Sequence, residues 1–270
     1  MHVLQLREPV SAWTHGAGLV LAIVGALVLW RRGDGPGKRL SLMVYGLGLI
    51  CCYAASTLYH AVRVPADRLG VFVRLDSVGI FALIAGSYTP LAWNLMRGRW
   101  RAWTLAAVWG VAGSAIVLLA SGRRFTPVAG TCVYLGMGWG VVACYAQLAR
   151  VVSHRALMPI VAGGVSYSVG AVLNVLRWPA LWPGVFGFHE VFHLFVIAGS
   201  LAHYGFILKV VVPFGRASGE GPREPGYVLG SGFSGGLVRE TACGPRSVES
   251  GTLAGLDDRE VAPMRPISDV

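Results

Sequence analysis

The chain has 270 residues, of which 54% are hydrophobic and only 13% are charged, and its formal net charge is +10. Soluble domains carry about 25% charged residues, so this composition disfavours a soluble enzyme, a nucleic-acid-binding protein and a secreted disulfide-rich domain. Eight of the 13 acidic residues follow position 213, whereas the basic residues before it form short clusters between long apolar runs. Such a distribution is typical of the loops of a membrane protein.

Seven apolar runs are long enough to cross a bilayer, which takes about 20 residues of helix. They lie near 12–30, 41–61, 71–93, 102–120, 127–148, 157–177 and 188–212. Because backbone groups in lipid must satisfy their own hydrogen bonds, the runs predict an all-α bundle of seven transmembrane helices over residues 1–213. Residues 214–270 are rich in Gly, Ser and Pro, which predicts a disordered polar tail.

Few ionisable side chains lie inside these runs, where they are costly and usually functional or paired. The acidic residues and histidines among them are His15, His60, Asp76, His189, Glu190, His193 and His203. Odd-numbered spans begin, and even-numbered spans end, on the same side of the membrane. All but Glu190 and His203 are therefore expected in one layer near a membrane face, with His203 about 15 Å deeper along its helix.

The spacing of the histidines predicts a metal site. His189 and His193 are four residues apart, so both imidazoles lie on one helical face, as in a two-histidine metal grip. Ser56 and His60 repeat this spacing in the 41–61 span. Three histidines with an open position for water are typical of catalytic zinc. We therefore expect Zn²⁺ at His60, His189 and His193, with Asp76 and Ser56 beside it.

Other interpretations of the same residues stay open. A single His60 near an interface is often structural, and Asp76 could pair with Arg74 or cap its helix. His15 and His203 are expected to be packed and hydrogen-bonded. Residues 189–193 also match HExxH, in which the Glu is the general base of a metalloprotease. A later acidic ligand would then be expected, but the next acid is Glu220 in the tail.

Several short motifs recur in a familiar order. They are Thr14-His15-Gly16, Ser56-Thr57-Leu58-Tyr59-His60, Leu75-Asp76, the segments 84–90, 134–139 and 163–170, and His189-Glu190-Val191-Phe192-His193. Over residues 8–212 they resemble the haemolysin III family, which is grouped with the adiponectin and progestin receptors (the PAQR group). Two departures are Ser77, where bacterial relatives often have His, and Ser11, where Asn is common.

This resemblance implies seven helices around a buried zinc bound by His60, His189 and His193. Asp76 would hold the zinc-bound water, and Ser56 would lie close by. The wider superfamily includes ceramidases, so the implied chemistry is metal-dependent hydrolysis of lipid amide or ester bonds. The alternative is a receptor-like or membrane-perturbing protein in which zinc is structural. Membrane lipids are the expected partners, and no nucleic acid is expected.

The expected location is the cell membrane, crossed several times. Seven Lys and Arg flank the spans on the side of the N-terminus and twelve on the other side. The positive-inside rule then places the N-terminus and the metal layer outside. The receptor relatives imply the opposite orientation, so the side stays open, as do the substrate and the oligomeric state.

Overall fold

The computed structural model describes residues 6–215, and in this range it contains helices and no β-strand. The helices are α1 (Pro9–Arg32), α2 (Gly35–Ala61), α3 (Ala66–Leu95), α4 (Gly98–Ala120), α5 (Pro127–Trp139), α6 (Val141–Leu148), α7 (His154–Leu176), α8 (Phe188–Phe206) and the π-helical turn Ile207–Val211. Apart from its first two positions, the predicted tail of residues 214–270 lies outside the described residues.

Seven helical segments in this range are long and apolar enough to cross a membrane, which confirms the predicted fold class. Helices α5 and α6 together form one of them, Pro127–Leu148, and α8 continues through the π-helical turn to form another, Phe188–Val211. Several helices begin before the predicted runs, most clearly α2 at Gly35 and α3 at Ala66. These extra turns are more polar than the runs that predicted the spans.

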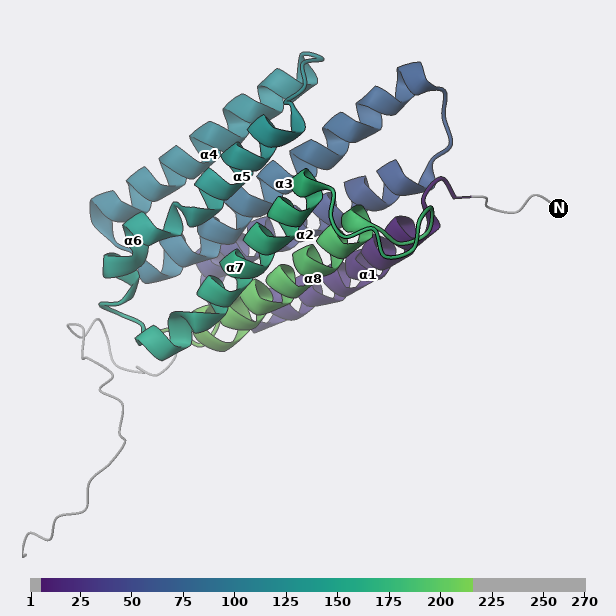
Figure 1. The fold of residues 1–270 in the computed structure, drawn as a ribbon. Coiled ribbons are helices and arrows are strands. Elements are labelled where there is room, and N and C mark those ends of the chain that lie inside the picture. The colour runs from purple at the N-terminus through teal and green to yellow at the C-terminus, as the bar shows by residue number, and fades with distance from the viewer. Residues whose placement is uncertain (1–5, 216–270) are drawn as a thin grey trace, which may run out of the picture. The chain divides into compact units, whose positions relative to one another are not determined.

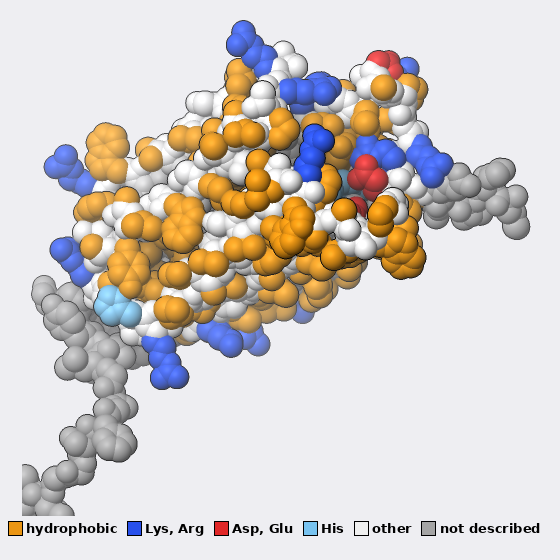
Figure 2. All heavy atoms as spheres, in the orientation of Figure 1, with side chains coloured by type: hydrophobic (Ala, Val, Ile, Leu, Met, Phe, Trp, Pro, Cys, Tyr) orange, Lys and Arg blue, Asp and Glu red, His pale blue; other side chains and the backbone are white. Residues whose placement is uncertain are grey.

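Neighbouring helices pack in a simple pattern (Figure 1). α2 lies between α1 and α3, α4 packs against α3, and α8 contacts both α1 and α7. Large apolar side chains such as Trp103, Val117 and Leu176 point outward. Figure 2 shows hydrophobic side chains over most of one face, with Lys and Arg mainly toward the helix ends. This surface suits contact with lipid along the helices.

Two glycines bring α2 and α3 close together. A Cβ atom on Gly79 would lie 2.8 Å from the Cα of Cys52, and one on Gly48 would lie 2.9 Å from the carbonyl oxygen of Ala82. Small residues at a helix interface allow such backbone contact in membranes. The close approach places the C-terminal turns of α2, with Ser56 and His60, beside Asp76 of α3.

The 127–148 span is broken rather than continuous. The hydroxyl of Tyr88 donates to the carbonyl oxygens of Met137 at 2.7 Å and Gly138 at 2.9 Å. These carbonyls would otherwise accept only the helical hydrogen bonds of the following turn. A side chain inserted into the ladder, next to the flexible Gly140, is a recognised cause of a helix break. α5 therefore ends at Trp139, and α6 begins at Val141.

Candidate metal centre

Three histidines from two helices converge at one end of the bundle. His60 lies in the last turn of α2, and His189 and His193 lie in the first two turns of α8. One ring nitrogen from each lies within 4.8 Å of the others, and the Nε2 atoms of His60 and His189 are 3.3 Å apart. His60 and His193 are fully buried. The group is positioned to hold a metal ion.

Hydrogen-bond partners fix the protonation of two of these rings. Nδ1 of His60 contacts the carboxylate of Glu8, and Nδ1 of His189 lies 3.1 Å from Oδ1 of Asn174. Both partners are acceptors, so each Nδ1 carries a proton, and Nε2 of each ring is the nitrogen that can bind a metal when the ring is neutral. The two Nε2 atoms face each other at hydrogen-bond distance. Metal–nitrogen bonds of about 2.0–2.1 Å in a tetrahedral site separate ligand nitrogens by about 3.3 Å, so this pair of nitrogens has the spacing of metal ligands.

The third histidine has an available nitrogen. Nδ1 of His193 is buried and has no hydrogen-bond partner within residues 6–215. A buried polar atom without a partner costs free energy, and a metal ion would satisfy it. The ring of His193 stacks on that of His15 with 3.6 Å between centroids. This stack holds the imidazole of His193 beside the other two rings.

Glu8 is held beside His60 by the segment that precedes α1. The backbone N–H of Glu8 donates to the carbonyl oxygen of His60 at 3.0 Å, and that of Arg7 donates to Ala61 at 3.4 Å. The hydrogen bond from His60, aided by the nearby Arg7, keeps the pKa of Glu8 below its usual value. Glu8 therefore faces His60 as an ionised carboxylate.

Ser56 lies between a histidine and a carboxylate. Its Oγ is 2.7 Å from Nδ1 of His15, which agrees with the expectation that His15 is hydrogen-bonded to a neighbouring helix. Asp76 is close enough to Ser56 and His60 to interact with both side chains. Because α3 begins at Ala66, Asp76 lies well inside the helix, and the alternative that it caps this helix is wrong.

The glutamate of the HExxH motif has other partners. Oε1 of Glu190 accepts a hydrogen bond from the hydroxyl of Ser11, and Oε2 accepts one from the backbone N–H of Gly187, both at 2.8 Å. The second contact caps the N-terminus of α8. One carboxylate oxygen thus joins α1 to α8 and the other caps α8, which argues against Glu190 as the general base of a metalloprotease.

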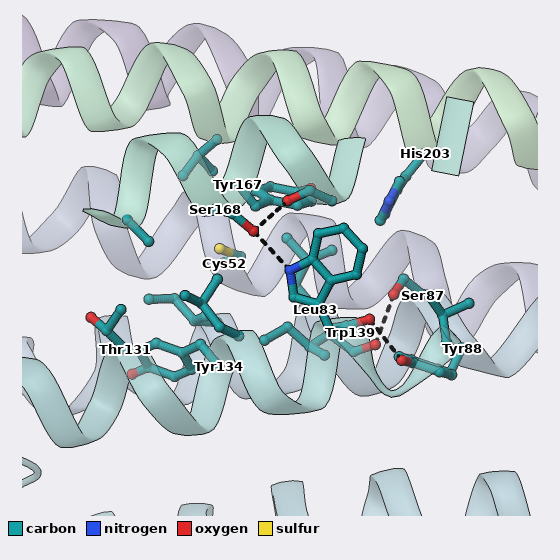
Figure 3. Close-up of a pocket in the computed structure, with 18 of the residues that line it drawn as sticks. Cys52, Leu83, Ser87, Tyr88, Thr131, Tyr134, Trp139, Tyr167, Ser168 and His203 are labelled. Atoms are coloured by element: carbon teal, nitrogen blue, oxygen red, sulfur yellow. Dashed lines mark hydrogen bonds between the residues drawn. The ribbon is translucent and has the colours of Figure 1, made fainter. Parts of the chain in front are cut away.

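A cavity of about 380 Å³ begins at this centre and extends along the inside of the bundle. Asp76 and His189 line one end, while His203 and Ile207 line it further along α8. Figure 3 shows Tyr167 and Trp139 against its middle, where the indole N–H of Trp139 donates to Ser168 at 2.9 Å. Most other lining side chains are apolar. The cavity suits an elongated apolar group with one end near the histidines.

Sequence reasoning missed two residues of the centre, Glu8 and Asn174. Glu8 stands just outside the first predicted span, near the layer that contains the histidines. Asn174 lies near the end of the sixth span, and even-numbered spans end in the layer that contains the histidines. The same topological argument that grouped the histidines could therefore have found both.

Comparison with known proteins places the chain in a family. A family model described as "Haemolysin-III related" matches residues 4–204. "Hemolysin-3" of Bacillus cereus is 33% identical over 213 residues, covering 77% of this chain and 93% of that protein. The human "Monocyte to macrophage differentiation factor" is 27% identical, covering 74% and 82%. The "Adiponectin receptor protein" of Drosophila melanogaster is 26% identical, covering 76% and 51%. The chain thus belongs to the haemolysin III family, as its motifs predicted.

Proposed function

We propose that this multi-pass membrane protein is a zinc-dependent hydrolase of lipid amide or ester bonds. The observation that carries the proposal is the cavity that runs from Asp76 and His189 into the apolar interior of the bundle. It would place a carbonyl group of a lipid beside the histidines while the acyl chain occupies the cavity. The membrane lipids that surround the protein would then also supply its substrate.

The metal would be held by His60, His189 and His193. Imidazole nitrogens suit zinc, although they also suit several other transition metals. When bound to three such ligands, zinc supplies Lewis acidity that makes water nucleophilic near neutral pH. The ionised Glu8 adds negative charge at this end of the bundle, which favours a dication there.

The remaining steps fall to Asp76 and Ser56. The carboxylate of Asp76 would orient a water molecule and accept its proton as the water attacks the lipid carbonyl. The hydroxyl of Ser56, held by His15, would donate a hydrogen bond either to Asp76 or to the negative charge that develops on the carbonyl oxygen. The apolar walls would exclude bulk water from the reacting groups.

A second candidate function is non-catalytic. A metal at these histidines would also tie the end of α2 to the start of α8, which is the arrangement of a structural site. The relatives named "Hemolysin-3" and "Adiponectin receptor protein" suggest membrane-perturbing or receptor-like roles. In either case we propose the cell membrane as the location and membrane lipids as the partners.

Metal analysis and lipid turnover on the same preparation separate these functions. Detergent-purified wild-type protein and His60→Ala are analysed by mass spectrometry for metal, then incubated with ceramide and phospholipid vesicles. A hydrolase is expected to contain about one zinc per chain and to release fatty acid, and His60→Ala is expected to lose both. Zinc without turnover of either lipid would favour the structural role, and a folded wild type without metal would contradict both.

A further inference from the structure

The segment before α1 reaches across the end of α2 and contributes to the metal centre. Backbone hydrogen bonds from Arg7 and Glu8 to the last residues of α2 fix its position. The guanidinium of Arg7 lies 4.1 Å from the ring centroid of Tyr59 and within 3.1 Å of a carboxylate oxygen of Glu8. These contacts hold the carboxylate of Glu8 at His60, although Glu8 itself is outside the helix.

The three histidines differ in what lies behind them. His60 has the carboxylate of Glu8 and His189 has the neutral amide of Asn174, whereas Nδ1 of His193, which has no hydrogen-bond partner in the described part of the chain, is the nitrogen open to the metal. A carboxylate behind a ligating imidazole fixes its tautomer and raises the basicity of the opposite nitrogen more than an amide does. Nε2 of His60 is therefore expected to be more basic than Nε2 of His189.

We propose that Glu8 is a positioning residue of the metal centre, which acts through His60 and sets the affinity for the metal. This inference rests on the metal-binding part of the proposed function and is independent of whether the protein hydrolyses lipids. Glu8 accepts a hydrogen bond from Nδ1 of His60, so in the neutral ring Nε2 is the nitrogen that faces the metal. Its negative charge also offsets the cost of a dication at the membrane boundary.

The test compares Glu8 with Glu190, a second carboxylate near the histidines. Glu190 follows the ligand His189 directly, but its oxygens contact Ser11 and the Gly187 N–H instead of an imidazole. Glu8→Gln keeps the size and a hydrogen-bond acceptor and removes the charge, while Glu190→Gln makes the same change at the control position. The measurement is the zinc affinity of full-length protein in detergent, by competition with a chromophoric chelator.

We expect Glu8→Gln to weaken zinc binding about tenfold and Glu8→Ala to weaken it up to about 100-fold. Glu190→Gln is expected to lower the unfolding temperature of the metal-free protein and to leave the zinc affinity within about threefold of wild type. The unfolding temperature of Glu8→Gln should rise less on addition of zinc than that of wild type, because weaker binding stabilises less.

Wild-type affinity in Glu8→Gln, or an equal loss in both Gln variants, would overturn the role of Glu8. If the Gln variant does not fold, Glu8→Asp provides the same test, since it keeps the charge but its shorter side chain no longer reaches His60. We expect weaker zinc binding in that variant too, and unchanged binding would overturn the inference. A folded wild type that binds no zinc would instead refute the proposed metal site itself.

Discussion

Two histidines of α8, His193 and His203, have the same side chain on the same helix but different surroundings. His193 lies in the second turn among His15, His60 and His189, and its Nδ1 has no hydrogen-bond partner within residues 6–215. His203 lies near the end of the helix, where its Nε2 is 3.3 Å from the carbonyl oxygen of Ile160 and its ring edge packs against Tyr167.

The comparison shows that neighbouring acceptors decide what a membrane-buried histidine does. A backbone carbonyl satisfies an imidazole N–H completely, so His203 needs no further partner. In the cluster around His193, Glu8 and Asn174 instead accept hydrogen bonds from Nδ1 of His60 and His189, and the Nε2 atoms of these two rings face each other.

The largest expected effect is on zinc content and comes from replacing His193, in the metal region formed by the clustered histidines. Replacing His203, further along the same helix, provides the comparison. His193→Ala should reduce bound zinc from about one per chain to near zero, because two imidazoles and a carboxylate nearby do not complete the site. His203→Ala should retain full zinc content, although its loss of packing lowers the unfolding temperature. Mass spectrometry of metal in detergent-purified protein measures both. Equal metal content in the two variants would contradict the distinction between the regions.

A smaller effect is expected inside the metal region from Asp76→Asn. Asp76 interacts with Ser56 and His60, and the proposed mechanism uses its carboxylate as the proton acceptor. We expect lipid turnover to fall about 10²- to 10⁴-fold while zinc stays bound. Ser87→Ala in the cavity wall is a control, since its hydroxyl donates only to the carbonyl oxygen of Ile84 in the same helix. Full turnover in zinc-loaded Asp76→Asn would rule out this role.

The sequence predicted the seven spans and the grouping of the histidines because hydropathy and alternating topology act over whole helices. The i, i+4 spacing of His189 and His193 placed both rings on one face. The sequence could not predict the break between α5 and α6 at Gly140, because this break depends on the hydroxyl of Tyr88, which belongs to another helix. Topology could have placed Glu8 in the layer of the histidines, but its contact with His60 depends on backbone hydrogen bonds between segments distant in sequence.

The region around His203 depends on close contact between α7 and α8. A Cβ on Gly163 would lie 2.5 Å from Cδ2 of His203 and 3.1 Å from the carbonyl oxygen of Gly199, whereas one on Gly164 would lie 3.9 Å from Trp139. Gly163→Ala should therefore destabilise the bundle by about 1–3 kcal/mol. Gly164→Ala should be neutral or stabilising by up to about 1 kcal/mol, because alanine favours helix.

Thermal unfolding in detergent measures both alanine variants, and the neighbouring positions make them a matched pair. The expected destabilisation is a property of packing, so zinc content should be unchanged in each. If Gly163→Ala lost zinc as well, packing around His203 would be coupled to metal binding at His193, which would contradict the separation of the two regions.

The smallest expected effect lies at the boundary of the metal region, where Ser11 joins α1 to α8. Its buried hydroxyl donates to Glu190, which keeps a second contact with the Gly187 N–H. Ser11→Ala should therefore cost only about 1 kcal/mol of stability. Because Glu190 does not contact a histidine ring, the zinc affinity should not change. A fall in affinity measured with the chelator would mean that α1 helps to position the histidines through α8, and that the metal region extends beyond the side chains that touch the imidazoles.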